Sequence, residues 1–199
     1  MNIQYKDFIG TYTNVYPEGF CEHLIEQFNV LQNSGAGYNR QESENVTKLV
    51  KDDWATNINL TVSNVNNFNG MYCKDVFFSG LQQCFDMYTN EYPALQNVNI
   101  RASHLKMQKI KPGGGYHTWH FEQGNGEQAN RCMVYMVYLN TLEPEEAGET
   151  EFLYQQTRMQ PVSNTVVLWP AGYTHVHRGN VVFGTNHKYI VTGWFSIVD

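Results

Sequence analysis

The second half of the chain is a succession of short apolar and aromatic segments separated by turns. One turn, Lys111-Pro112-Gly113-Gly114-Gly115, could not be accommodated in a helix, and Glu146-Ala147-Gly148 is a second turn-rich stretch. Met133–Leu139 is continuously apolar, so we expect a strand buried on both faces. This spacing predicts a β-sandwich or barrel. The predicted strands are Ile100–Ile110, Met133–Leu139, Thr150–Tyr154, Thr165–Trp169 and Tyr189–Ile197.

The first half of the chain is predicted to be partly helical. Apolar residues recur at helical spacing over Phe20–Leu31, and Asn33-Ser34-Gly35 then favours a helix end and a loop. A second helix is expected from about Gly70 to Glu91, ended by Pro93. The polar stretch Arg40–Asp53 is predicted to be a surface connection.

Length and composition favour one globular domain, because 199 residues with 42% hydrophobic content can bury a substantial core. We predict a single domain over residues 1–199, with a helical or mixed flank at 1–97 and a β core at 98–199. The formal charge of −6 and the 13 scattered basic residues disfavour a nucleic-acid-binding surface. No apolar run approaches the roughly 20 residues that span a bilayer, and the N-terminus lacks the apolar core of a signal peptide. The expectation is therefore a cytoplasmic protein without a membrane partner.

The segment Tyr116–Glu122 contains a His-x-Glu pair. On an extended backbone, His120 and Glu122 point the same way, and His177 from a distant strand is the natural third ligand. Two histidines and one carboxylate hold a metal on one face and leave positions open, as in non-haem Fe(II) oxygenases. The pair alone also recurs by chance, and a hydrogen-bonded core histidine beside a surface glutamate is the competing interpretation.

Other histidines compete for the same role. His175 and His177 share a strand face if that segment is extended, so periodicity does not separate them. His117 could also replace the first-strand ligand, but its same-face neighbour is Trp119 rather than a carboxylate. We expect His117, His175 and His187 to lie beside the metal ligands or at the surface.

Seven short motifs follow one another over roughly Leu105 to Val198, nearly half of the chain. They are Gly113-Gly114-Gly115, His120-Phe121-Glu122, Tyr138-Leu139-Asn140, Gly148-Glu149-Thr150-Glu151-Phe152, Val167-Leu168-Trp169-Pro170, His177-Arg178-Gly179 and Lys188-Tyr189-Ile190-Val191-Thr192-Gly193-Trp194. Each motif is weak alone, but the ordered set resembles the prolyl 4-hydroxylase-like branch of the Fe(II)/2-oxoglutarate-dependent dioxygenases.

This resemblance implies a mainly β (α+β) fold, a double-stranded β-helix (jelly roll) with N-terminal helices packed on one side. It implies that His120, Glu122 and His177 bind Fe(II), and that Lys188 pairs with the distal carboxylate of 2-oxoglutarate, to which Thr192 can add a hydrogen bond. It further implies O2 as co-substrate, ascorbate for reactivation, and hydroxylation of an unactivated C–H bond with release of succinate and CO2. A prolyl or other peptide or protein residue, or a small molecule, is the expected substrate.

The chemistry of the last strand agrees with this assignment. Lys188, Ile190, Thr192 and Trp194 alternate onto one strand face, and a buried lysine needs an anionic partner to keep its charge. Arg178 is the competing carboxylate anchor, but it lies in a turn beside a ligand, so we expect it to be solvated.

Three features depart from the family pattern. Glu122 stands where most relatives have Asp, which moves the carboxylate one methylene farther from the backbone. The spacing from His177 to Lys188 is one residue longer, and we expect residues 183–186 to absorb the difference. Ile110 lies near the place where relatives often carry a tyrosine that binds the co-substrate.

Two other functions are compatible with a jelly roll, because one fold serves many activities. A binding module without oxygenase activity would be favoured by lost ligands, but all three ligand candidates are present. A cupin-type protein could use the same metal triad without 2-oxoglutarate, and Lys188 argues against that alternative.

Overall fold

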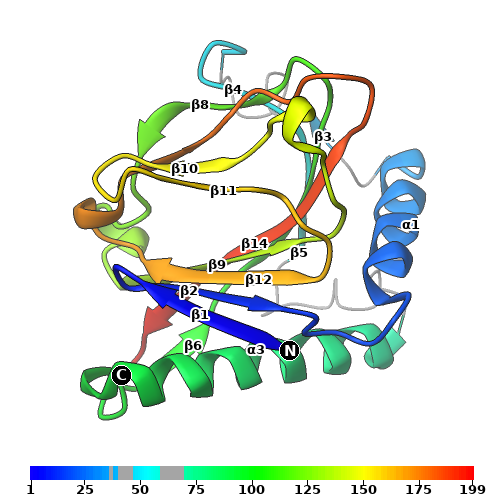
Figure 1. The fold of residues 1–199 in the computed structure, drawn as a ribbon. Helices are drawn as coiled ribbons and strands as arrows, with labels where there is room; N and C mark the ends of the chain where they lie inside the picture. Colours follow the sequence, from blue (N-terminus) through cyan, green and yellow to red (C-terminus); the bar gives the residue numbers. More distant parts are fainter. Residues whose placement is uncertain (36–37, 40–46, 59–69) are drawn as a thin grey trace.

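Two antiparallel β-sheets face each other in the computed structural model, which describes residues 1–35, 38–39, 47–58 and 70–199 (Figure 1). The strands of the larger sheet are β1 (Asn2–Lys6), β2 (Ile9–Thr13), β3 (Tyr38–Asn39), β5 (Trp54–Ile58), β6 (Ile100–Ala102), β7 (Leu105–Ile110), β9 (Arg131–Tyr138), β12 (Thr165–Pro170) and β14 (Lys188–Ile197). Those of the smaller sheet are β4 (Lys51–Asp52), β8 (Gly115–His120), β10 (Thr150–Phe152), β11 (Thr157–Met159) and β13 (His177–Gly179).

The strand order is that of a jelly roll. The larger sheet runs β1-β2-β12-β9-β14-β7-β5-β3, with β6 also paired to β14, and the smaller sheet runs β11-β10-β13-β8-β4. The predicted mainly β fold class is confirmed. Strands from the first half of the chain are hydrogen-bonded into both sheets, since β2 pairs with β12, β5 with β7 and β4 with β8.

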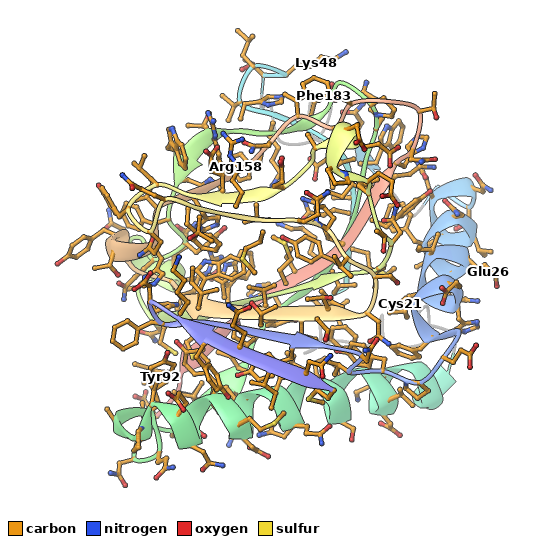
Figure 2. The ribbon with its side chains drawn as sticks, in the orientation of Figure 1. Cys21, Glu26, Lys48, Tyr92, Arg158 and Phe183 are labelled. Atoms are coloured by element: carbon orange, nitrogen blue, oxygen red, sulfur yellow. The ribbon has the colours of Figure 1, made fainter. Side chains whose placement is uncertain are left out.

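Two long helices, α1 (Phe20–Asn33) and α3 (Gly70–Glu91), confirm the predicted helices and cover the outer face of the larger sheet (Figure 1). Phe85 of α3 stacks on Phe195 of β14 with ring centroids 4.6 Å apart. Figure 2 shows Glu26 of α1 pointing outward, whereas Cys21 is buried against the sheet. No described helix is both long and apolar enough to cross a membrane. The short 3-10 helices are η2 (Pro93–Leu95), η3 (Gly126–Gln128), η4 (Pro144–Glu146) and η5 (Tyr173–His175).

Strand β9 is buried on both faces, as its continuous apolar sequence predicts. Tyr135 and Val137 join the apolar cluster that packs the helices on the larger sheet. Met136 and Tyr138 belong to the second cluster, on the opposite face of β9, with Phe152 of the smaller sheet. Full burial of each such side chain contributes about 1.5–3 kcal/mol to the free energy of unfolding.

The predicted strand Ile100–Ile110 is interrupted, and this prediction was wrong in that respect. The chain forms β6 and β7, which both pair with β14, and Ser103 and His104 lie between them. The backbone N–H and the hydroxyl of Ser103 both donate to the carbonyl oxygen of Trp194, at 2.9 and 3.2 Å. The extra residues bulge because Gly193 allows the His104 carbonyl to approach β14 closely.

The prediction that Arg40–Asp53 forms a surface connection agrees with the exposed residues 47–50 but was wrong for Lys51–Asp53; residues 40–46 lie outside the described residues. Lys51–Asp53 are buried, each at most 8% exposed. The first two of them form β4 at the edge of the smaller sheet, and Asp52 makes an ion pair with Lys111 at 3.4 Å. Charged residues are rarely buried unless they are paired, which is why their polarity suggested a surface position.

Replacement of Gly193 by alanine should lower the free energy of unfolding by about 3 kcal/mol, the upper range for overpacking. A Cβ at this position would overlap the carbonyl oxygen of His104 and the hydroxyl of Tyr135. Urea unfolding would measure the change. Gly172→Ala is the matched control, because its Cβ would meet only Gln123 Oε1, at an ordinary 3.5 Å. An unchanged unfolding midpoint in Gly193→Ala would contradict the proposed close packing.

Candidate metal and co-substrate site

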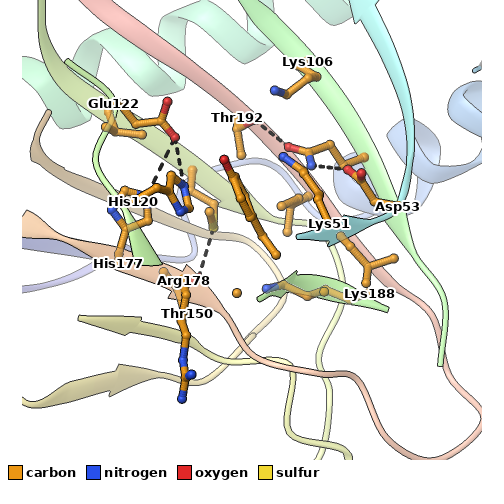
Figure 3. A pocket seen from close by; sticks show the side chains of 18 of the residues that line it. Lys51, Asp53, Lys106, His120, Glu122, Thr150, His177, Arg178, Lys188 and Thr192 are labelled. Carbon is orange, nitrogen blue, oxygen red and sulfur yellow. Dashed lines mark hydrogen bonds and ion pairs between the residues drawn. The ribbon is translucent and has the colours of Figure 1, made fainter. Parts of the chain in front are cut away.

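The three predicted ligands converge at the end of β8 (Figure 3). His120 ends β8, His177 begins β13, and the two are cross-strand partners. Glu122 Oε1 lies 3.3 Å from His120 Nε2 and 3.8 Å from His177 Nε2. One ligand atom from each of the three residues lies within 4.8 Å of the others. This donor set of two imidazoles and one carboxylate fits Fe(II), which non-haem oxygenases hold in the same way.

Backbone carbonyl groups orient both imidazole rings. His120 Nδ1 is 2.9 Å from the Thr118 oxygen, and His177 Nδ1 is 2.9 Å from the His175 oxygen. A carbonyl can only accept, so each Nδ1 carries a proton, and Nε2 is the ring atom that faces Glu122 and could coordinate a metal. Burial, reinforced by the neighbouring His120 ring, lowers the pKa of His177 to about 4, which keeps that imidazole neutral at physiological pH. Such partners of metal-ligating histidines fix ring orientation and ligand basicity.

Glu122 follows the end of β8 and is held in place by residues of other segments. Its Oε2 accepts a hydrogen bond from Trp194 Nε1 at 3.0 Å and lies 3.6 Å from the Arg131 guanidinium. Its backbone N–H donates to the Ala171 carbonyl oxygen at 3.0 Å. Burial raises the pKa of Glu122, but the hydrogen bond and charge of the neighbouring imidazole outweigh burial and hold the pKa well below its usual range. The longer glutamate side chain therefore reaches the cluster as an ionised carboxylate.

Lys188 is only 4% exposed and lines the same cavity as the three candidate ligands. Its ammonium donates to the Gly148 carbonyl oxygen at 2.6 Å and lies 5.4 Å from the Tyr138 ring. Tyr138 in turn donates to Thr150 Oγ1 at 2.7 Å. Burial lowers the pKa of Lys188 to about 7, and the charge of Glu149 only partly opposes this shift. Tyr138 and Thr150 were not predicted as site residues, although both lie in motifs of the resemblance.

A hydrogen-bonded chain occupies another part of the cavity wall. Thr192 Oγ1 donates to Gln108 Oε1 at 2.8 Å, and Gln108 Nε2 donates to Asp53 Oδ2 at 2.5 Å. Lys51 and Lys106 line the cavity beside this chain (Figure 3). The expected hydrogen bond from Thr192 to the co-substrate stays a prediction, because its hydroxyl proton is directed at Gln108. Sequence analysis did not predict Lys106 and Gln108 as cavity residues. Their alternation on β7, which places both side chains on one strand face, is the signal that could have identified them.

The competing histidines lie outside the ligand cluster that the described residues form. His175 is buried in η5, where its Nε2 contacts the Asp7 carbonyl oxygen at 2.9 Å, and its own carbonyl orients His177. His117 and His187 are half-buried and do not join the cluster.

Arg178 was predicted to be solvated, and the structure corrects this. Its guanidinium makes an ion pair with Glu151 at 2.7 Å and lies 4.4 Å from the Trp119 ring centroid. The cross-strand register places Glu151 directly opposite Arg178, so the pair forms between neighbouring strands. Tyr116 also lines the cavity and stacks on His120 with ring centroids 3.7 Å apart.

Comparisons with known proteins agree with this geometry. Residues 105–196 match the model of the 2OG-Fe(II) oxygenase superfamily. No curated protein matches the sequence. Among solved structures, the viral collagen prolyl hydroxylase of Paramecium bursaria Chlorella virus-1 is 18% identical, with 96% of this chain and 97% of that chain covered and a TM-score of 0.69.

Two further structures are similar over most of their length. A prolyl hydroxylase from Trichoplax adhaerens is 17% identical, with coverage of 96% and 84% and a TM-score of 0.71. A prolyl-4-hydroxylase from Pseudomonas putida is 15% identical, with coverage of 95% and 92% and a TM-score of 0.70. At these identities the likeness establishes a shared fold, and the family match spans all three candidate ligands and Lys188. Nearly half of the chain is therefore similar to the 2OG-Fe(II) oxygenase superfamily, whose enzymes use Fe(II), 2-oxoglutarate and O2, and the chain has the fold of the prolyl hydroxylases.

Proposed function

We propose that this enzyme hydroxylates an unactivated C–H bond of a peptide or protein residue, with prolyl residues the first candidates, and releases succinate and CO2. The observation that carries the proposal is the convergence of His120, Glu122 and His177 on the cavity that also contains buried Lys188. The peptide substrate class is supported by the prolyl hydroxylases of like fold, one of which was solved with a peptide fragment.

In this proposal, each group of residues has a distinct task. His120, Glu122 and His177 hold Fe(II), which when bound supplies the activation of O2 for C–H oxidation. Lys188 neutralises the distal carboxylate of 2-oxoglutarate through a charge-assisted hydrogen bond. The apolar walls of the cavity, which include Met136, exclude water and so strengthen these electrostatic contacts.

Succinate production tests the proposal. Purified protein with Fe(II), ascorbate and 2-oxoglutarate should form succinate slowly even without the primary substrate, and the analogue N-oxalylglycine should inhibit it. If no turnover is detected, titration of 2-oxoglutarate into metal-loaded protein by calorimetry should still show binding. Absence of both turnover and binding would contradict the proposed function.

The affinity for 2-oxoglutarate should fall about tenfold per pH unit above pH 7. Only the protonated amine of Lys188 pairs with a carboxylate, and its pKa of about 7 means that binding at higher pH must take up a proton. Calorimetry at pH 8 in two buffers of different ionisation enthalpy would count that proton. Lys188→Arg stays charged and should abolish the dependence. A pH-independent affinity of the wild-type protein would contradict this expectation.

A further inference from the structure

The two oxygens of the Glu122 carboxylate have different surroundings. Oε1 lies 3.3 Å from His120 Nε2 and 3.8 Å from His177 Nε2. Oε2 instead accepts the hydrogen bond of Trp194 Nε1 at 3.0 Å, and the Arg131 guanidinium lies 3.6 Å from this same oxygen. Figure 3 shows one Glu122 oxygen directed at both imidazoles and the other pointing away from them. The carboxylate is therefore divided between the candidate metal position and two donor side chains.

Arg131 and Trp194, the donor pair, are already assembled against each other. Arg131 begins β9 and Trp194 lies on β14, and these strands are hydrogen-bonded neighbours in the larger sheet. The guanidinium carbon lies 3.5 Å from the indole ring centroid, and Arg131 Nη1 also donates to the backbone carbonyl oxygen of Glu122 at 3.2 Å. Both imidazoles belong to the smaller sheet, so Glu122 spans the two sheets with one oxygen for each.

The contacts of Oε2 affect how Glu122 can bind a metal. A carboxylate can coordinate an ion through one oxygen or through both. The non-haem Fe(II) arrangement depends on positions that the protein leaves open, and a second glutamate oxygen would occupy one of them. Metal binding by Oε2 would cost the indole N–H its acceptor, and a buried donor without an acceptor is unfavourable. The donor pair therefore favours coordination through Oε1 alone.

We propose that Arg131 and Trp194 are positioning residues that retain Oε2 of Glu122 and so limit this ligand to one coordinating oxygen. This inference rests on the proposed function, because it takes His120, Glu122 and His177 as the metal ligands. In this role the donor pair preserves the open positions that 2-oxoglutarate and O2 require. Both residues act through Glu122 and not on the substrate.

Water-proton relaxation with Mn(II) as the bound ion tests this role without turnover. The relaxation rate per bound Mn(II) increases with the number of open positions that water occupies. Trp194→Phe, and still more the double variant Trp194→Phe/Arg131→Met, should lower this rate at saturating Mn(II). The decrease should reach about one third in the double variant, the loss of roughly one open position in three. A lower metal affinity alone would not change the rate, because every site is filled.

Binding of N-oxalylglycine to the Mn(II)-loaded protein provides a second readout. Calorimetry should show at least about tenfold weaker binding in the double variant, because the released glutamate oxygen competes with the analogue for the ion. Glu122→Asp shortens the side chain by one methylene, so we expect its carboxylate to leave the donor pair. In that background the double variant should weaken binding by less than about twofold, since the two changes remove the same contact.

Conservative and control variants separate positioning from general packing. Arg131→Lys keeps a positive charge beside Oε2 and should retain most of the wild-type relaxation rate. Trp119→Phe is the control for Trp194→Phe, because the Trp119 ring packs against the Arg178 guanidinium, 4.4 Å away. Arg158→Met is the control for Arg131→Met, because the Arg158 side chain is 61% exposed on the smaller sheet. Both controls should show wild-type values.

The possible outcomes distinguish this inference from the proposed function. An unchanged relaxation rate and an unchanged N-oxalylglycine affinity in Trp194→Phe and in Arg131→Met would overturn the inference alone. These two single variants reach the same oxygen from different strands, so the test does not depend on the folding of the double variant. Failure of the wild-type protein to bind Mn(II), or binding that persists in both His120→Ala and His177→Ala, would instead overturn the proposed function and this inference with it.

Discussion

Replacement of His177 by alanine should lower Fe(II)-dependent succinate formation by more than about 100-fold, because loss of even a ligand's hydrogen-bond partner commonly costs 10–100-fold. The variant removes one of only two imidazole nitrogens in the cluster. His120→Ala should have the same effect. Both variants should also lose stoichiometric Fe(II) binding, measured by calorimetry under anaerobic conditions.

His117→Ala is the matched control for this prediction. His117 lies on the same strand as His120 but outside the ligand cluster, so its variant should retain Fe(II) binding and succinate formation. Iron-dependent succinate formation that persists in both His120→Ala and His177→Ala would rule out the ligand assignment.

Replacement of Lys188 by methionine should weaken 2-oxoglutarate binding at least about 30-fold, since a buried carboxylate would lose its cationic partner. The same variant should raise the free energy of unfolding of the ligand-free protein by about 1 kcal/mol or more, because it removes a costly buried charge. Calorimetry and urea unfolding would measure the two opposite effects. Lys109→Met should show neither, and an unchanged 2-oxoglutarate affinity in Lys188→Met would contradict the role of this lysine.

The pH dependence of stability follows from the same group. The pKa of Lys188 is about 7 in the folded protein, below its ordinary value of 10.5, so the unfolded chain binds more protons between these two values. Its contribution to stability is therefore complete above pH 10.5 and is lost as the pH falls toward 7. The wild-type protein should become more stable relative to Lys188→Met as the pH rises through this window.

Periodicity in the sequence predicted the main elements of the fold. The apolar spacing of Phe20–Leu31 and the continuous apolar run Met133–Leu139 are local signals, and the structure confirms both. The interruption of β6 and β7 was not predictable, because it depends on the close approach of the His104 carbonyl to Gly193 on a strand distant in sequence.

For the candidate site, the sequence indicated which types of residue bind the metal, but it did not determine their contacts in the folded protein. Periodicity could not choose between His175 and His177, whereas in the structure η5 ends at the first and β13 begins at the second. The pairing of Glu122 with Trp194 also depends on strand order. Lys51–Asp53 were misread as a surface segment because their polarity suits solvent, and only the folded chain reveals that they are buried and that Lys51 and Asp53 line a cavity.

The cross-strand pairing of His120 and His177 would couple metal binding to the stability of the folded protein. A ligand that binds only the folded chain raises the free energy of unfolding as its free concentration increases. A metal bound between β8 and β13 would therefore stabilise the contact between two strands that are distant in sequence. Resistance to heat and to proteolysis would then follow iron supply, and iron-starved cells would degrade this protein faster than iron-replete ones.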